Sequence, residues 1–163
     1  MKLFSIILSA LLCLSLSSCS VKNKHSGEIL AELWERCEKL PRGVIYESGT
    51  PEGEENYMSP TLAEALYGER SAEYFPLIEE FSIYLSSFAS PYEIAVFICY
   101  SSTDARKIER MCRERADIVS VALRHTEFYE LCDNIRIVRK GDTVVFLMTD
   151  RPDDMARLVK RLI

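Results

Sequence analysis

Ile94-Ala95-Val96-Phe97-Ile98-Cys99 is the stretch that decides the fold of this 163-residue chain. Almost nothing polar interrupts it, and a run that is apolar on both sides is typical of a strand in the middle of a sheet. Residues 81–86, Phe-Ser-Ile-Tyr-Leu-Ser, instead alternate, which predicts a strand with one buried and one wet face. Because only a short link containing Ser90-Pro91 separates the two segments, they are predicted to form a hairpin.

The order strand, strand, helix then occurs a second time. A long helix follows the first hairpin, since apolar residues step by three or four positions over 108–123, and residues 102–104 offer its cap. A second hairpin is predicted from residues 135–138 and 144–148, joined by a glycine-containing turn. A final helix is predicted to start at Asp150, with acids in its first turn and bases near its end.

The part of the chain before the first hairpin is predicted to be helical. Apolar residues recur at helical spacing over 29–40, with Ser26 as the cap. Residues 47–56 form a turn-rich acidic connection, and residues 60–66 fit a short helix. Together the elements predict one α+β domain over residues 28–163. Its expected core is a four-stranded, mostly antiparallel sheet built from two ββα units, with helices packed on one face and an N-terminal helix before it.

The N-terminus predicts export. Lys2 precedes an apolar run from Leu3 to Leu16, which is too short for a permanent membrane span but suits a secretory signal peptide over residues 1–18. The next residues, Leu16-Ser17-Ser18-Cys19, resemble the bacterial lipobox. That resemblance implies cleavage before Cys19 and a diacylglycerol on its sulfur, and two acyl chains give near-permanent membrane anchoring. The alternative is an ordinary secretory signal in which Cys19 is incidental.

Residues 19–27 are polar and without periodicity, so they are interpreted as a tether that holds the domain off the membrane.

The charge balance of the chain argues against nucleic acid as a partner. The chain has 20 Lys and Arg against 25 Asp and Glu, a net charge of −5. An acidic domain is not expected to bind nucleic acid.

From Ser59 onward the chain resembles a family of uncharacterised lipoproteins from Gram-positive bacteria, a domain of unknown function. The similar stretches are Leu66-Tyr67-Gly68, Tyr84-Leu85-Ser86-Ser87, Glu93 to Phe97, Lys140-Gly141 and Thr149-Asp150. The chain departs from the pattern at Ser90-Pro91-Tyr92, where a more glycine-rich turn is expected, and in its cysteine content. The resemblance implies a lipid anchor, an α+β fold and a location on the extracytoplasmic face of the cell membrane. It implies no catalytic residue.

The cysteines and histidines offer no recognisable reaction centre. After the signal peptide and Cys19, the thiols left are Cys37, Cys99, Cys112 and Cys132, with no C-x-x-C pair to suggest a metal site. Buried thiols are the favoured interpretation, and a disulfide between Cys112 and Cys132 is the alternative. His125 is interpreted as a solvated histidine near a helix end. Neither a serine-hydrolase nor a zinc-protease motif is present, so no catalytic residue, metal or cofactor is expected.

Two clusters are candidate binding surfaces. The long helix carries Arg106, Lys107, Arg110, Arg113 and Arg115, which would bind an acidic partner or wall polymer, or else form a solvated face with local ion pairs. Ten of the sixteen aromatic residues lie between Tyr57 and Tyr100. Tyr84 and Tyr92 are the predicted binding residues, because sheet alternation turns Tyr84 away from Phe81, Ile83 and Leu85. The alternative is that the N-terminal helices cover these rings as a second core.

The sequence therefore predicts a non-enzymatic, membrane-anchored lipoprotein that binds an envelope protein or a wall component. A solute-capturing lipoprotein of an uptake system is the alternative. That alternative is weaker, because binding proteins that close around a ligand usually have two lobes and this chain has length for one.

Overall fold

The computed structural model describes residues 24–37, 40–87 and 91–163 and shows an α+β protein. The predicted signal peptide and Cys19 lie outside these ranges. The elements in chain order are α2 (Ser26–Arg36), β1 (Gly43–Glu47), α3 (Pro60–Tyr67), α4 (Ser71–Tyr74), η1 (Phe75–Leu77), β2 (Ile78–Ser86), β3 (Glu93–Cys99), α5 (Ser102–Leu123), η2 (Tyr129–Asn134), β4 (Ile135–Lys140), β5 (Thr143–Met148) and α6 (Pro152–Leu162).

The strands form one antiparallel sheet in the order β1-β2-β3-β5-β4. Both predicted hairpins, β2–β3 and β4–β5, are confirmed, and the apolar strand β3 lies at the centre of the sheet. The prediction of four strands is wrong, because β1 adds a fifth at the edge beside β2. Its five residues, Gly-Val-Ile-Tyr-Glu, begin two positions after Pro41. Their alternation of apolar and polar residues is too short to distinguish a strand from the neighbouring turn sequence.

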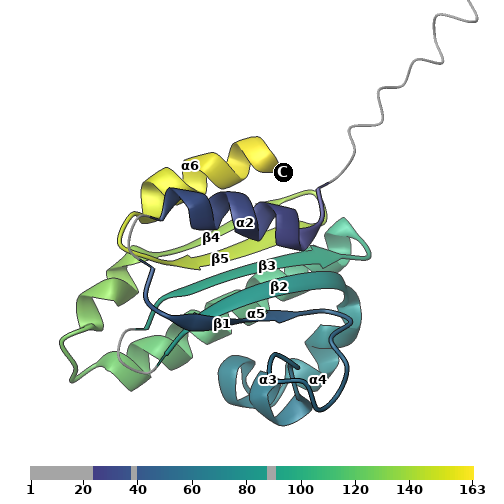
Figure 1. Ribbon diagram of the computed structural model, residues 1–163, viewed down its shortest axis with the longest axis horizontal. Helices are drawn as coiled ribbons and strands as arrows, with labels where there is room; N and C mark the ends of the chain where they lie inside the picture. Colours follow the sequence, from purple (N-terminus) through teal and green to yellow (C-terminus); the bar gives the residue numbers. More distant parts are fainter. Residues whose placement is uncertain (1–23, 38–39, 88–90) are drawn as a thin grey trace, which may run out of the picture.

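Helices cover both faces of the sheet, which corrects the prediction that they pack on one face. Figure 1 shows α2 and α6 side by side over one face, while α3, α4 and α5 lie on the other. The physical reason is that β3 and β5 are apolar on both sides. Each of their faces must therefore be shielded from water by a separate layer.

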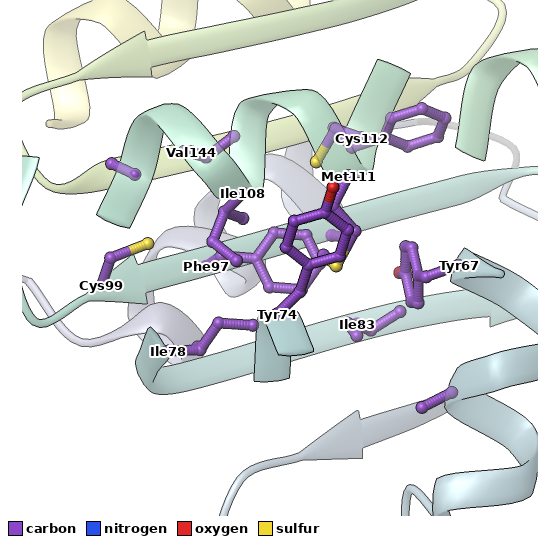
Figure 2. Packing of buried hydrophobic residues seen from close by; sticks show 14 of the residues in the cluster. Tyr67, Tyr74, Ile78, Ile83, Phe97, Cys99, Ile108, Met111, Cys112 and Val144 are labelled. Carbon is purple, nitrogen blue, oxygen red and sulfur yellow. The ribbon is translucent and has the colours of Figure 1, made fainter. Parts of the chain in front are cut away.

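The larger of the two cores lies between the sheet and α5. Phe97 of β3 is fully buried there, close to Ile108 and Met111 of α5 (Figure 2). The ring of Tyr67 meets that of Phe97 edge-on, with centroids 5.9 Å apart. The smaller core joins Leu33 of α2 and Val159 of α6 to the opposite face of the sheet.

Several helix ends differ from the predictions by one to four residues. Ser59 caps α3 as expected, and its hydroxyl accepts a hydrogen bond from the Leu62 N–H at 3.1 Å. Ser101, rather than a residue in 102–104, caps α5. The helix α2 begins at Ser26, so Ser26 and Gly27 of the predicted tether are helical, and His25 rather than Ser26 is the N-cap. The helix ends at Arg36 rather than at residue 40. The helix α6 begins at Pro152 rather than Asp150.

Candidate functional site

A charged groove lies along the outer side of α2 and α6. The end of α2 and the length of α6 enclose a hollow of about 750 Å³. Its charged lining consists of Glu35, Arg36, Arg151, Asp154, Arg157, Lys160 and Arg161, above the apolar side chains of Met155 and Leu158. Five positive and two negative side chains therefore meet at one place in a protein of net charge −5.

The amphipathic sequence of α6 produces this groove. Met155 and Val159 are buried against the sheet, so helical spacing turns Arg157, Lys160 and Arg161 outward. These bases lie near the end of the helix, where its dipole favours positive charge. The local sequence thus places three positive side chains on the exposed side of a helix whose other side is fixed by the core.

Part of the positive charge is neutralised within the groove. Arg151 donates to Asp154 at 2.8 Å, and Arg157 also donates to that carboxylate. The hydrogen bond from Arg151, followed by the charge of both arginines, holds the pKa of Asp154 below its usual value. Asp154 therefore remains ionised and positions both guanidinium groups.

Three cations of the groove are left for other partners. Arg36, Lys160 and Arg161 form no ion pair with any residue in 24–37, 40–87 or 91–163. A concave surface with excess positive charge raises the local concentration of anions. The groove is therefore suited to an anionic ligand.

A second hollow, of about 600 Å³, shares Arg157 and Lys160 with the first and extends over β4. Its other two cations already have partners. Arg136 donates to Asp153 at 2.8 Å, and Arg139 donates to Glu109 at 2.7 Å. The groove between α2 and α6 is consequently the better candidate for binding.

Tyr84 is not part of an exposed surface, so this prediction is corrected. Its side chain is fully buried beneath α2, where the hydroxyl donates to the Pro41 carbonyl at 2.6 Å. The ring packs edge-on against Trp34, with centroids 4.8 Å apart, and burial raises the pKa of Tyr84 to about 12. Alternation does turn Tyr84 away from Ile83, but α2 covers that side too.

Tyr92, the second predicted binding residue, is half-buried and packs against the same smaller core. Burial raises its pKa, and the negative charge of Asp150 and the nearby Cys37 thiol raise it further. The Cys37 thiol in turn lies 3.8 Å from the sulfur of Met155, which lines the groove. Tyr92 therefore belongs to the packing beneath this end of the sheet.

The remaining predicted candidates are dispersed. All four cysteines within the described residues are free, so no disulfide joins Cys112 to Cys132. Burial raises the pKa of Cys37 to about 11 and that of Cys99 to about 12, which keeps both thiols protonated and unreactive. His125 is exposed just beyond α5.

Arg115 departs from the predicted basic surface of α5, and this was missed from the sequence. Its guanidinium is mostly buried and donates to the fully buried Glu93 carboxylate at 2.7 and 2.9 Å. The Tyr67 hydroxyl donates to the other Glu93 oxygen at 3.1 Å, and Arg115 also donates to the Leu66 carbonyl at 3.2 Å. Because these charges satisfy one another, the network fastens α3 and α5 to β3.

The other basic residues of α5 behave as a solvated face with local ion pairs. Arg113 pairs with Glu109, and Lys107 lies 3.7 Å from Asp104. Arg106 donates to Thr103 at 3.0 Å and is otherwise exposed. This outcome agrees with the second of the two interpretations of the cluster for these residues.

Comparison with known proteins adds no relative. No protein-family model matches the chain, and neither the curated proteins nor the solved structures contain a significant match. Among the residues that the structure describes, no group of three or more His, Cys, Asp or Glu side chains could hold a metal ion. Within the same residues, every helix is too short or too polar to cross a membrane.

Proposed function

We propose that this protein is a non-enzymatic lipoprotein, anchored through Cys19 on the extracytoplasmic face of the membrane, whose α2–α6 groove binds an anionic wall polymer. The observation that carries the proposal is a set of three cations, Arg36, Lys160 and Arg161, around a hollow of about 750 Å³; none of them forms an ion pair with a residue that the structure describes. A polymer with repeated phosphate groups supplies the anionic charge that a concave positive surface attracts. The resemblance of the chain to uncharacterised Gram-positive lipoproteins supports a location on the extracytoplasmic face of the membrane.

The lipobox supports the anchor, and the start of the fold is consistent with a short tether. The helix α2 begins at Ser26, seven residues after Cys19. A groove on α2 and α6 would thus remain close to the membrane, within the inner part of the wall. The alternative of a solute-capturing lipoprotein is less well supported, because the groove is lined mostly by exposed, charged side chains rather than by an enclosing apolar wall.

The groove is tested by titrating the full chain in neutral detergent with poly(glycerol phosphate). We expect saturable binding that weakens as salt rises, since exposed charges are screened. A Lys160→Ala/Arg161→Ala variant should bind about tenfold more weakly, which corresponds to about 1.4 kcal/mol. The matched control is Arg106→Ala, which removes an exposed arginine from α5. Equal weakening by the control, or equal binding of a neutral polysaccharide, would contradict a groove-specific anion site.

The anchor is tested separately with Cys19→Ala. This variant should lose lipidation and appear as uncut precursor or as released protein. Normal processing together with retention in the membrane fraction would contradict the lipoprotein assignment, whatever the groove binds.

A further inference from the structure

Within residues 24–37, 40–87 and 91–163, no strand pairs with the outer edge of β1, which lies at the end of the sheet. The Ser48 N–H donates to the Phe81 carbonyl at 3.0 Å, and the Ser87 N–H donates to the Arg42 carbonyl at 2.9 Å. Even-numbered residues of this segment thus direct their backbone groups toward β2. Since a strand alternates, Gly43, Ile45 and Glu47 direct theirs outward, away from the sheet.

Exposed apolar side chains lie next to this edge. Ile45 is 38% exposed and stands opposite Tyr84 in the pairing of β1 with β2. Trp34 is also 38% exposed and packs on the same Tyr84 ring. Ile45 and Trp34 therefore flank the buried Tyr84 ring. They lie beside the edge of β1 whose backbone N–H and C=O groups point away from the sheet.

The opposite edge of the sheet is protected in the way that natural sheets usually are. Three of the six residues of β4, Arg136, Arg139 and Lys140, are basic, and the first two are paired with Asp153 and Glu109. By contrast, β1 contains neither lysine nor proline. Its single charge, Glu47, accepts a hydrogen bond from the Ser82 hydroxyl at 3.4 Å.

We propose that β1 pairs with β1 of a second copy of this chain, so that two five-stranded sheets join into one antiparallel sheet. Centring the pair on Ile45 makes the strand self-complementary. The two Ile45 side chains meet, Val44 faces Tyr46, and Gly43 faces Glu47, so no like charges are opposed. Such a pair uses the outward N–H and C=O groups of Gly43 and Ile45 and the N–H of Glu47. The Glu47 carbonyl also accepts a hydrogen bond from the Thr50 N–H at 3.4 Å, and its second lone pair faces the partner strand.

The symmetry of this pairing agrees with a shared anchoring surface. A two-fold axis perpendicular to the sheet keeps the same face of both copies on the same side. Both α2 helices would then lie on the same side of the joined sheet, so the two predicted tethers would both start from that side. This agreement favours a second copy over an unrelated strand, although the pairing itself depends only on the β1 edge.

Cross-linking tests the pairing and its register. In an antiparallel pair, residues that exchange hydrogen bonds have Cα atoms about 5.5 Å apart, which is within disulfide range. Cells expressing the full chain with Ile45→Cys should therefore give a disulfide-linked dimer after mild oxidation. Glu47→Cys is the matched control, because its two copies would lie about 13 Å apart across the axis. Dimers from both variants, or from neither, would overturn the proposed register.

A mass measurement tests the same surface without cysteines. The full chain in detergent should sediment as a dimer, whereas Ile45→Lys should sediment as a folded monomer, because it places two positive charges across the axis. A monomeric unmodified chain, or Ile45→Cys cross-linked only to a different protein, would overturn the proposal. Lys160→Ala/Arg161→Ala should leave the dimer intact, which separates this test from that of the groove.

Discussion

The two faces of the sheet are both covered by helices, yet they differ in what the helices leave exposed. On one face, α3, α4 and α5 bury the larger core and enclose the ion pair between Glu93 and Arg115. On the other, α2 and α6 cover the smaller core, and the groove beside them is lined by Arg36, Lys160 and Arg161, which form no ion pair among the described residues. On the first face, the charges form a buried ion pair that links α5 to the sheet. On the second face, the charges are exposed to solvent along the groove.

The largest expected effect lies in the core under α5. Phe97→Ala removes a fully buried ring from the central strand, so we expect the free energy of unfolding to fall by about 3–5 kcal/mol. Chemical denaturation of the full chain in detergent measures this loss. Val121→Ala, a change at an exposed position of α5, is the control and should be nearly neutral. Equal midpoints for both variants would mean that this face is not the main source of stability.

Breaking the buried ion pair should cost nearly as much. Arg115→Met leaves the Glu93 carboxylate buried without its counter-charge, so we expect a loss of about 3 kcal/mol. The double variant Glu93→Gln/Arg115→Met removes both charges and should be more stable than Arg115→Met alone. If the double variant is the less stable of the two, the pair does not act as a coupled unit.

On the second face, the hydroxyl of Tyr84 provides a smaller test. Tyr84→Phe removes the donor to the Pro41 carbonyl but keeps the ring under α2, so a loss of about 1 kcal/mol is expected. Tyr100→Phe, at a residue that is 66% exposed, should change the unfolding midpoint little. A loss for Tyr84→Phe no larger than for Tyr100→Phe would indicate that this face is packed more loosely than the structure shows.

The comparison of the faces also explains what could be predicted from sequence. The strand β2 and the helix α5 were predictable from their regular apolar periodicity, and β3 and β5 from apolar runs with almost no polar interruption. The second helical layer was implied by the doubly apolar run of β3, but a sequence pattern does not say which helices supply it. The prediction that Tyr84 is exposed used the correct strand alternation. It was wrong because it assumed that no helix covers that face of the sheet, whereas α2 does.

Other features depend on contacts between distant residues. Glu93 begins a strand, and Arg115 lies in a charged helix 22 residues further along the chain. Nothing in either local sequence indicates that the two side chains form an ion pair. The groove needs Arg36 of α2 beside Lys160 and Arg161 of α6, a meeting that only the packing of the two helices creates. The clue available from sequence was the basic end of the last helix, which suited the helix dipole as well as it suited a ligand.

The smallest expected effect concerns how α2 is held on its face, and it depends on pH. Burial alone would raise the pKa of Glu80, but hydrogen bonds from the His25 ring, the Ser26 hydroxyl and the Ser26 N–H more than offset this, so the pKa lies below its ordinary value of 4.5.

A carboxyl whose pKa is lowered in the folded state stabilises that state fully above its unfolded pKa, and this contribution is lost as pH falls through the folded pKa. We therefore expect the unfolding midpoint to drop more steeply below about pH 4.5 in the unmodified chain than in Glu80→Gln. Glu73→Gln, at an exposed carboxylate paired only loosely with Arg70, should keep the steep drop. Parallel acid profiles for the unmodified chain and Glu80→Gln would show that the start of α2 is held by its apolar contacts with the sheet and not by this carboxylate.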